Sequence, residues 1–228
     1  MKWLSLANVF YKHCMNTKFL TLLALTFSAI SLSAQNQPAK PISLFDGKTL
    51  KGWKTVNPEF MKLWSVMDGV ITGGDGKTKI PKNTFLVTES EYKDFEFSCL
   101  FRISGDHGTG LINSGIQYRS KVMDGKMIGY QADIGKGYWG DIYDEHRRNK
   151  ALVKGDLSTV KHLLKEDGWN SYLIRCTGNR HELYINGIKT SDYIENDPGF
   201  SIAGVIALQL HSGGVAKVEF RDIMITEL

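Results

Sequence analysis

The feature that most constrains this chain is a period-two alternation of apolar and polar residues, repeated in short runs between turns. From Asp94 to Ile103, alternate positions are apolar: Phe95, Phe97, Cys99, Phe101 and Ile103. Residues 216–228 close the chain with another alternating run. Successive side chains of a β-strand point to opposite faces, so the pattern predicts strands with one buried face.

Glycine usage supports an all-β fold. All 23 glycines follow residue 34, where they make up about 12% of the residues against a usual ~7%. Asp68-Gly69 and Asn186-Gly187 each separate two apolar runs by two residues, which is typical of tight hairpins. Ten or more short strands with glycine-bearing turns predict an antiparallel β-sandwich.

The first 34 residues resemble a leader for export. Lys18 precedes a 14-residue stretch, Phe19 to Leu32, that is too short to span a bilayer comfortably. Small residues up to Ala34 then form a cleavage site before polar Gln35. We expect residues 1–34 to be a signal peptide, 35–41 a linker and 42–228 one domain. The domain is then exported, periplasmic or secreted, with no membrane span.

Charge and cysteine content exclude two classes of protein. Three of the 28 Lys and Arg residues lie in the leader, which leaves the rest of the chain nearly neutral and without a basic patch for nucleic acid. Cys99 and Cys176 lie in expected strands; they could pair after export or stay as buried thiols. The absence of a CxxC motif argues against structural zinc.

Three expected strands carry directional hydrogen-bonding residues on their polar face. The pairs are Gln117 with Arg119, Gln131 with Asp133, and Gln209 with His211. A sheet with one solvated face explains alternation, but solvated faces usually carry Lys, Glu and Thr. If the three strands are neighbours, these side chains form one polar floor.

A loop at residues 137–149 packs aromatic, acidic and arginine residues between glycines. Aromatic rings stack on sugar rings, whereas carboxylates and guanidinium groups bind hydroxyls. The alternative is a hydrated loop with internal ion pairs. The candidate sugar contacts from this loop are Trp139, Tyr143, Asp144 and Arg147.

The chain resembles the 3-keto-disaccharide hydrolase family, formerly a domain of unknown function. The motifs that carry the resemblance are Phe45-Asp46-Gly47-Lys48, Gly52-Trp53 and residues 113–119, 129–133, 169–172, 184–187, 204–211 and 218–223. Together they run from about residue 42 to residue 228. The resemblance implies a concanavalin A-like jelly roll and a role in carbohydrate breakdown. Many members have Gly-Ala-Ile-Tyr where this chain has Gly140-Asp141-Ile142-Tyr143, so its substrate could differ.

A glycoside oxidised at C3 has an acidic C2 proton, and its removal leads to loss of the C1 substituent. This chemistry needs a base, a stabiliser for the enolate oxygen and an acid for the leaving group. The base candidates are Asp133 and His211, and the oxyanion partners are Arg119 and Arg148. Asp144 or Glu145 could be the acid or a metal ligand. Amides that could orient sugar hydroxyls are Asn113, Gln117, Gln131 and Gln209.

Several alternatives remain open at this point. A divalent metal could polarise the ketone, with Asp133, Glu145 and His211 as a ligand set, although no spaced metal motif supports it. Two-carboxylate glycoside hydrolysis is a nearby variant. A non-catalytic carbohydrate-binding module and a structural sandwich are alternatives to an enzyme. The chain shows no dinucleotide fingerprint, so a separate oxidoreductase would supply a keto substrate.

Overall fold

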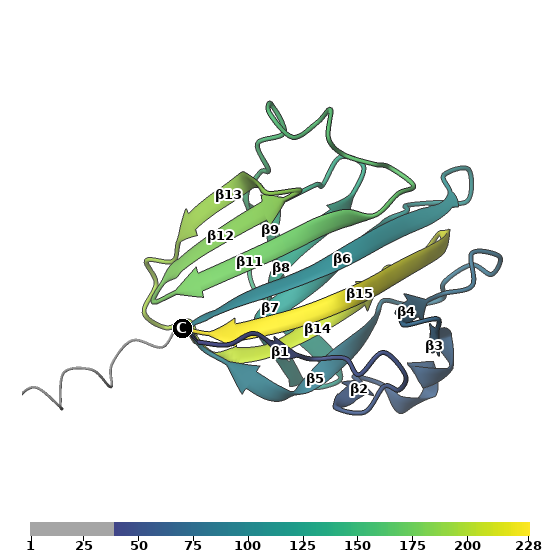
Figure 1. Ribbon diagram of the computed structural model, residues 1–228, viewed down its shortest axis with the longest axis horizontal. Coiled ribbons are helices and arrows are strands. Elements are labelled where there is room, and N and C mark those ends of the chain that lie inside the picture. The colour runs from purple at the N-terminus through teal and green to yellow at the C-terminus, as the bar shows by residue number, and fades with distance from the viewer. Residues whose placement is uncertain (1–38) are drawn as a thin grey trace, which may run out of the picture. The chain divides into compact units, whose positions relative to one another are not determined.

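The computed structural model describes residues 39–228, which form two antiparallel sheets stacked face to face (Figure 1). Among the described residues, the regular helical structure is one 3₁₀ helix, η1 (Pro58–Leu63). The predicted antiparallel β-sandwich is therefore confirmed, and its strand pairing confirms both predicted hairpins.

The first sheet, here sheet A, has eight strands. In order they are β13 (Ile188–Ile194), β12 (Arg180–Ile185), β11 (Asn170–Thr177), β6 (Phe95–Asp106), β15 (Val215–Glu227), β4 (Val70–Gly73) and β3 (Trp64–Met67), with β1 (Ile42–Ser43) paired to β15. The predicted alternating strand from residue 95 is β6, and its apolar face is buried. The last predicted run is β15.

The second sheet, here sheet B, has seven strands. In order they are β10 (Ala151–Val153), β9 (Ile142–Glu145), β8 (Lys126–Gly135), β7 (Asn113–Met123), β14 (Gly204–Leu210), β5 (Thr84–Tyr92) and β2 (Trp53–Thr55). The three strands expected to share a polar floor are β7, β8 and β14, and they are consecutive neighbours in this sheet.

The main core lies between the inner faces of the two sheets. Phe97 and Phe101 of β6 pack there with Ile116 and Tyr118 of β7, and all four side chains are fully buried. Cys99 and Cys176 are both free thiols in this core. Burial raises the pKa of the Cys176 thiol to about 12, so it behaves as a small apolar residue.

The predicted signal peptide, residues 1–34, lies outside the described residues, as does most of the predicted linker. Regular structure begins with β1 at Ile42, where the linker is expected to end. In the part of the chain that the structure describes, no helix is long and apolar enough to cross a membrane.

Candidate functional site

A pocket of about 320 Å³ lies on the outer face of sheet B, and we call it the Asp133 pocket. Seven predicted site residues line it: Asn113, Gln131, Asp133, Tyr143, Glu145, Gln209 and His211. They come from β7, β8, β9 and β14 and the residue after β14. The structure therefore brings both base candidates, three amides and a candidate acid to one place.

Strand register explains how the pocket forms. Gly115 of β7 is paired with Asp133 of β8, and a Cβ at Gly115 would lie 2.6 Å from Cδ of Gln131. The missing side chain gives Gln131 room to extend over β7. Its Nε2 then donates a 2.6 Å hydrogen bond to Oδ1 of Asp133.

Asp133 is an acid in an unusually dry position. Its side chain lies in the pocket wall, but the residue is only 4% exposed. Burial raises the pKa of Asp133 to about 8, helped by Asp141 and Glu145 and opposed by the Gln131 hydrogen bond and Lys154. This carboxyl therefore carries a proton around neutral pH.

His211 has the opposite character. Its Nδ1 lies 2.7 Å from the carbonyl oxygen of Ser212, which can only accept a hydrogen bond. Nδ1 of the neutral ring is thus protonated, and Nε2 keeps its lone pair. Burial lowers the pKa of His211 below 6.5, partly offset by the Ser212 bond. The ring is a neutral base around neutral pH.

The strand β9 contributes a second acid and an aromatic ring. Tyr143 pairs with Gln131, and Glu145 lies two residues further along the same face. Burial raises the pKa of the Glu145 carboxyl, and the charge of Asp144 raises it further. His146, whose Nδ1 lies 3.1 Å from Oε1 of Glu145, has the opposite effect and lowers this pKa. Glu145 is thus a second proton donor candidate beside Asp133.

Gln209 presents an unsatisfied acceptor at the pocket. Its Oε1 is buried and has no hydrogen-bond partner among the described residues. A buried amide oxygen without a partner is costly, and a ligand hydroxyl or a water would satisfy it. Asn113 lines the same wall, so two amides face whatever occupies the pocket.

Sequence reasoning missed three lining residues. They are Asn83, Leu111 and Tyr138. Tyr138 is 36% exposed, whereas the neighbouring Trp139 is 6% exposed and packs against Phe101 with ring centroids 6.0 Å apart. The expected role of Trp139 in sugar stacking is wrong, because this ring belongs to the core. The Tyr138-Trp139 pair did indicate an aromatic residue at the pocket, but the exposed ring is that of Tyr138 and not that of Trp139.

Arg119 does not join the pocket, which corrects the expected polar floor. A bulge in β7 sets residues 118 to 121 against residues 130 to 128 of β8, and Arg119 adopts φ 45°. The bulge turns its fully buried side chain away, and its guanidinium donates to the carbonyl oxygens of Lys93 and Gly178 and to Asp94. These bonds join the β5–β6 turn to the β11–β12 turn, so Arg119 is not placed to stabilise an oxyanion in the Asp133 pocket.

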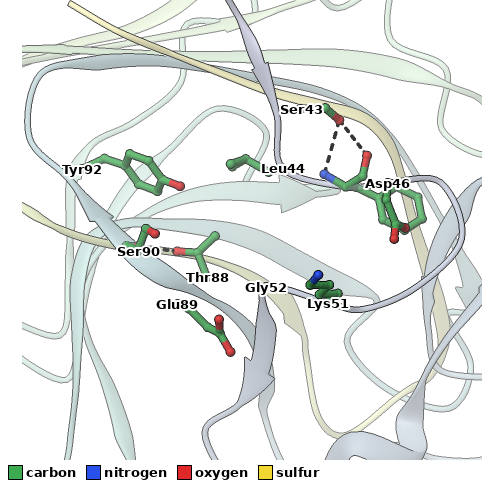
Figure 2. A pocket seen from close by; sticks show the side chains of 10 residues that line it. Ser43, Leu44, Asp46, Lys51, Gly52, Thr88, Glu89, Ser90 and Tyr92 are labelled. Carbon is green, nitrogen blue, oxygen red and sulfur yellow. Dashed lines mark hydrogen bonds between the residues drawn. The ribbon is translucent and has the colours of Figure 1, made fainter.

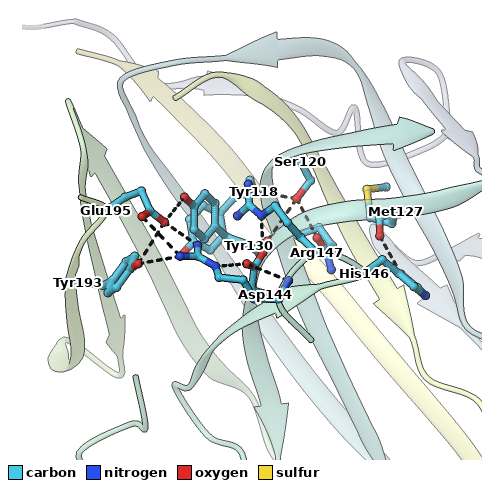
Figure 3. A network of polar contacts seen from close by, with 11 residues as sticks. Tyr118, Ser120, Met127, Tyr130, Asp144, His146, Arg147, Tyr193 and Glu195 are labelled. Atoms are coloured by element: carbon cyan, nitrogen blue, oxygen red, sulfur yellow. Dashed lines mark hydrogen bonds and ion pairs between the residues drawn. The ribbon is translucent and has the colours of Figure 1, made fainter. Parts of the chain in front are cut away.

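Asp144, Arg147 and Arg148 do not line the Asp133 pocket. Figure 3 shows Asp144 and Arg147 in a separate polar network. Asp144 alternates with Tyr143 and Glu145 along β9, so it points inward and is fully buried. It accepts hydrogen bonds from Nε of both arginines, and Arg148 Nη2 also donates to Glu195 of the segment after β13 at 2.5 Å. These groups form an ion-pair cluster between the two sheets, which keeps Asp144 and Arg148 away from the Asp133 pocket. Arg147, together with Arg119, lines a separate hollow of about 570 Å³.

Arg147 is further held by two aromatic rings. Its guanidinium carbon lies 4.3 Å from the ring centroid of Tyr130 and 4.1 Å from that of Phe200. Such stacking with an ion pair fixes a long side chain in one position.

Gln117 lies beneath the pocket instead of lining it. The residue is fully buried, and its Nε2 donates a 2.8 Å hydrogen bond to Oε1 of Gln131. A direct contact with sugar, which the strand pattern suggested, does not fit this position.

The candidate metal ligands are not gathered as a coordination group. Asp133, Glu145 and His211 line one pocket, but no three His, Cys, Asp or Glu residues within 39–228 are arranged to hold a metal ion. We therefore assign none of the three as a metal ligand.

A larger hollow of about 550 Å³ lies between residues 43–46 and β5 (Figure 2). Two of its polar side chains are engaged within the chain: Ser43 donates to the carbonyl oxygen of Phe45, and Asp46 accepts from the backbone of Lys48 and Thr49. No predicted site residue lines it, so size alone does not make it the better candidate.

Comparison with solved structures agrees with this architecture. A crystal structure from Parabacteroides distasonis described as a putative glycosyl hydrolase matches with TM-score 0.59 and 21% identity over 82% of this chain and 94% of that one. Carbohydrate-binding module CBM66 from Bacillus subtilis matches with TM-score 0.59 and 17% identity over 77% and 96%. Bacillus licheniformis β-glucanase matches with TM-score 0.55 and 10% identity over 85% and 100%.

The fold is thus the jelly-roll sandwich of these carbohydrate-related structures, with a polar pocket on one sheet. Within that class, residues 40–226 match the model of the 3-keto-alpha-glucoside-1,2-lyase-like domain, so the chain belongs to that family. No curated protein matches the chain.

Proposed function

We propose that this protein cleaves 3-keto-glycosides by elimination followed by addition of water. The observation that supports this most is the pair of oppositely shifted groups at one pocket. His211 has a pKa below 6.5 and Asp133 has a pKa of about 8. Two titratable groups whose environments push their pKa values apart are suited to act as base and acid at the same pH.

In the proposed first step, Nε2 of His211 takes the C2 proton of the oxidised sugar. The electron pair of the C2–H bond forms a C2=C3 double bond, and the C3 oxygen becomes an enolate. Amide N–H groups of Asn113 and Gln209 line the pocket and are the candidate donors to that oxygen. They take the role that sequence reasoning gave to the two arginines.

In the second step the enolate re-forms the C3 carbonyl, a C1=C2 double bond forms and the C1–O bond breaks. Oδ2 of Asp133 gives its proton to the leaving oxygen. Water then adds across C1=C2, with hydroxyl on C1 and hydrogen on C2, so that the net reaction is hydrolysis. The family description, a 1,2-lyase, supports the elimination half of this sequence.

The proposal extends to where the substrate comes from. The sequence shows no dinucleotide fingerprint, so we infer that a separate oxidoreductase oxidises C3 of the sugar before this enzyme acts on it. We infer export from the leader pattern alone.

The test separates the two steps. A 3-keto-glucoside and its unoxidised parent are incubated in D₂O, and C2 deuteration and sugar release are followed together. His211→Ala should lose both signals by roughly 10²–10⁴-fold. Asp133→Asn should keep C2 deuteration and lose sugar release, and a 4-nitrophenyl leaving group, which needs no acid, should restore release. Equal cleavage of the oxidised and parent glycosides contradicts the proposal.

A carbohydrate-binding module is the second candidate. The exposed Tyr138 and the unpaired Gln209 oxygen favour sugar binding whether or not chemistry follows. A module would bind the parent glycoside, release no product and exchange no C2 proton in the same experiment.

A further inference from the structure

A row of buried polar side chains runs beneath the Asp133 pocket, across β8 and β7. Ser120 Oγ donates to Gln117 Oε1 at 2.8 Å, and Gln117 Nε2 donates to Gln131 Oε1 at 2.8 Å. Gln131 Nε2 then donates to Asp133 Oδ1 at 2.6 Å. Each of the four residues is at most 4% exposed.

The row has a direction. In each bond the donor lies on the Ser120 side and the acceptor on the Asp133 side, so both amides point their N–H groups toward the carboxyl. Reversing both amides would press the Gln131 carbonyl against Asp133 Oδ1, which is tolerable only when Oδ1 itself carries the proton. Ser120 Oγ has one proton, and Gln117 Oε1 is its nearest acceptor at 2.8 Å; the carbonyl oxygens of Tyr118 and Tyr130 lie further away, at 3.0 and 3.3 Å.

The two oxygens of Asp133 therefore differ. Oδ1 accepts from Gln131, whereas Oδ2 has no hydrogen-bond partner within residues 39–228. Asp133 lines the pocket, but neither Gln117 nor Ser120 does.

We propose that Gln117 and Ser120 are positioning residues that act through Gln131: they keep Oδ1 of Asp133 an acceptor and leave Oδ2 as the oxygen that exchanges a proton with the sugar. The catalytic role of this row rests on the proposed function. Its effect on the titration of the Asp133 carboxyl does not, and can be measured without any turnover. The row also explains why β7 has glycine at position 115, since a Cβ there would displace Gln131.

The row acts on Asp133 together with three charged groups. Asp141, which lies between β8 and β9, and Glu145 of β9 both raise the pKa of Asp133, and Lys154 lowers it. The variants below leave these groups in place. Without the Gln117 amide, Gln131 is free to rotate, and the hydrogen bond that favours the carboxylate weakens. The titration of Asp133 should then move upward by roughly one pH unit, the size of a charge-assisted hydrogen bond.

The experiment is a carboxyl titration by NMR on the full chain labelled with ¹³C-aspartate, with the Asp133 signal assigned by its loss in Asp133→Asn. Gln117→Met and Ser120→Ala should each raise the midpoint by roughly one unit. Ser120→Thr keeps the hydroxyl and should titrate as the parent does. Ser114→Ala removes another buried hydroxyl of β7, one that donates to the Gln209 carbonyl outside the row, and should leave the midpoint unchanged.

Two outcomes overturn the inference: a folded Gln117→Met protein with the parent midpoint, or a Ser114→Ala shift as large as that of Ser120→Ala. Should one row variant fail to fold, the other decides. The titration needs no turnover, so an inactive parent protein would reject the proposed function and leave this inference standing. Where turnover is present, both row variants should lower the rate of sugar release with C2 deuteration retained.

Discussion

At the scale of single residues, His211 and Asp133 make opposite demands on pH. In the proposed mechanism, release of sugar needs neutral His211 and protonated Asp133. Activity should rise as pH climbs through the pKa of His211, below 6.5, and fall as pH climbs through about 8, the pKa of Asp133. The measurement is kcat/KM on a 3-keto-glucoside as a function of pH, from about 5 to about 9.5.

The matched control removes the upper limb of the pH profile and leaves the acidic limb. With the 4-nitrophenyl leaving group, which needs no acid, the parent should keep the acidic limb and lose the limb near 8, and Asp133→Asn should give the same profile as the parent on this substrate. A profile that keeps both limbs in this variant contradicts the assignment of the upper limb to Asp133.

His181 is a second residue whose burial affects behaviour at low pH. It is 1% exposed, and its ring centroid lies 4.4 Å from that of Tyr130 and 5.6 Å from that of Tyr118. Burial, helped by the nearby charge of Arg119, lowers the pKa of His181 from 6.5 to about 3. Between those two values the His181 site binds more protons in the unfolded chain than in the folded one. His181 therefore lowers the free energy of unfolding as pH drops below 6.5. Asp133, whose pKa is raised from 3.8 to about 8, contributes in the opposite direction between its own two values.

The expected contribution of His181 is a loss of about 1.4 kcal/mol for each pH unit below 6.5. Urea unfolding at pH 6.5 and pH 5 in the parent and in His181→Phe, which keeps an aromatic ring, measures it: the two slopes should differ by this amount. The exposed His162 provides the comparison, since His162→Gln should keep the slope of the parent. An unchanged slope in His181→Phe would assign the acid sensitivity to other groups.

At the scale of elements, the ion-pair cluster between β9 and the segment after β13 concerns stability. Arg148→Ala removes the cation that pairs with buried Glu195 and with Oδ2 of buried Asp144. The free energy of unfolding should therefore fall by about 3–5 kcal/mol. The turnover of the folded variant should match the parent, because Arg148 does not line the Asp133 pocket. Chemical denaturation and kcat at saturating substrate read the two effects separately.

Arg180→Ala is the matched control for that experiment. Arg180 pairs with Asp192 on the surface, where the two side chains are 49% and 33% exposed. Its loss should cost less than about 1 kcal/mol. A large drop in kcat for Arg148→Ala, with stability near the parent, would return this arginine to a role in the chemistry.

The bulge in β7 shows why the period-two alternation predicted the facing of only some of the site residues. Alternation correctly placed Gln131, Asp133, Gln209 and His211 on one face, because β8 and β14 are regular there. It failed for Arg119, because the bulge changes the parity of β7 after Tyr118. Two glycines indicate the bulge: a Cβ at Gly129 or Gly204 would lie 2.3 Å or 2.4 Å from an atom of Ser120. A sequence shows such glycines but not which strands they lie beside.

At the scale of the whole molecule, the sandwich could be predicted because hydrophobic alternation and hairpin turns are local properties of the chain. The site could be predicted only in part. The 137–149 loop has the composition of a sugar site, yet Asp144, Arg147 and Arg148 hold two sheets together and Trp139 packs in the core. Composition does not distinguish a binding loop from a buried ion-pair cluster, since both use the same residue types.

The last prediction concerns the exported form. If the leader is removed after Ala34, mass spectrometry of the protein from its native host should find an N-terminus near Gln35. Leu25→Arg places a charge in the apolar stretch and should block removal, so the uncleaved chain would accumulate inside the cell. Retention of intact Met1 or Met15 in the unaltered protein contradicts export. The result bears on the proposed function too, because an exported enzyme of this kind would need an oxidoreductase outside the cytoplasm to oxidise its glycoside substrate.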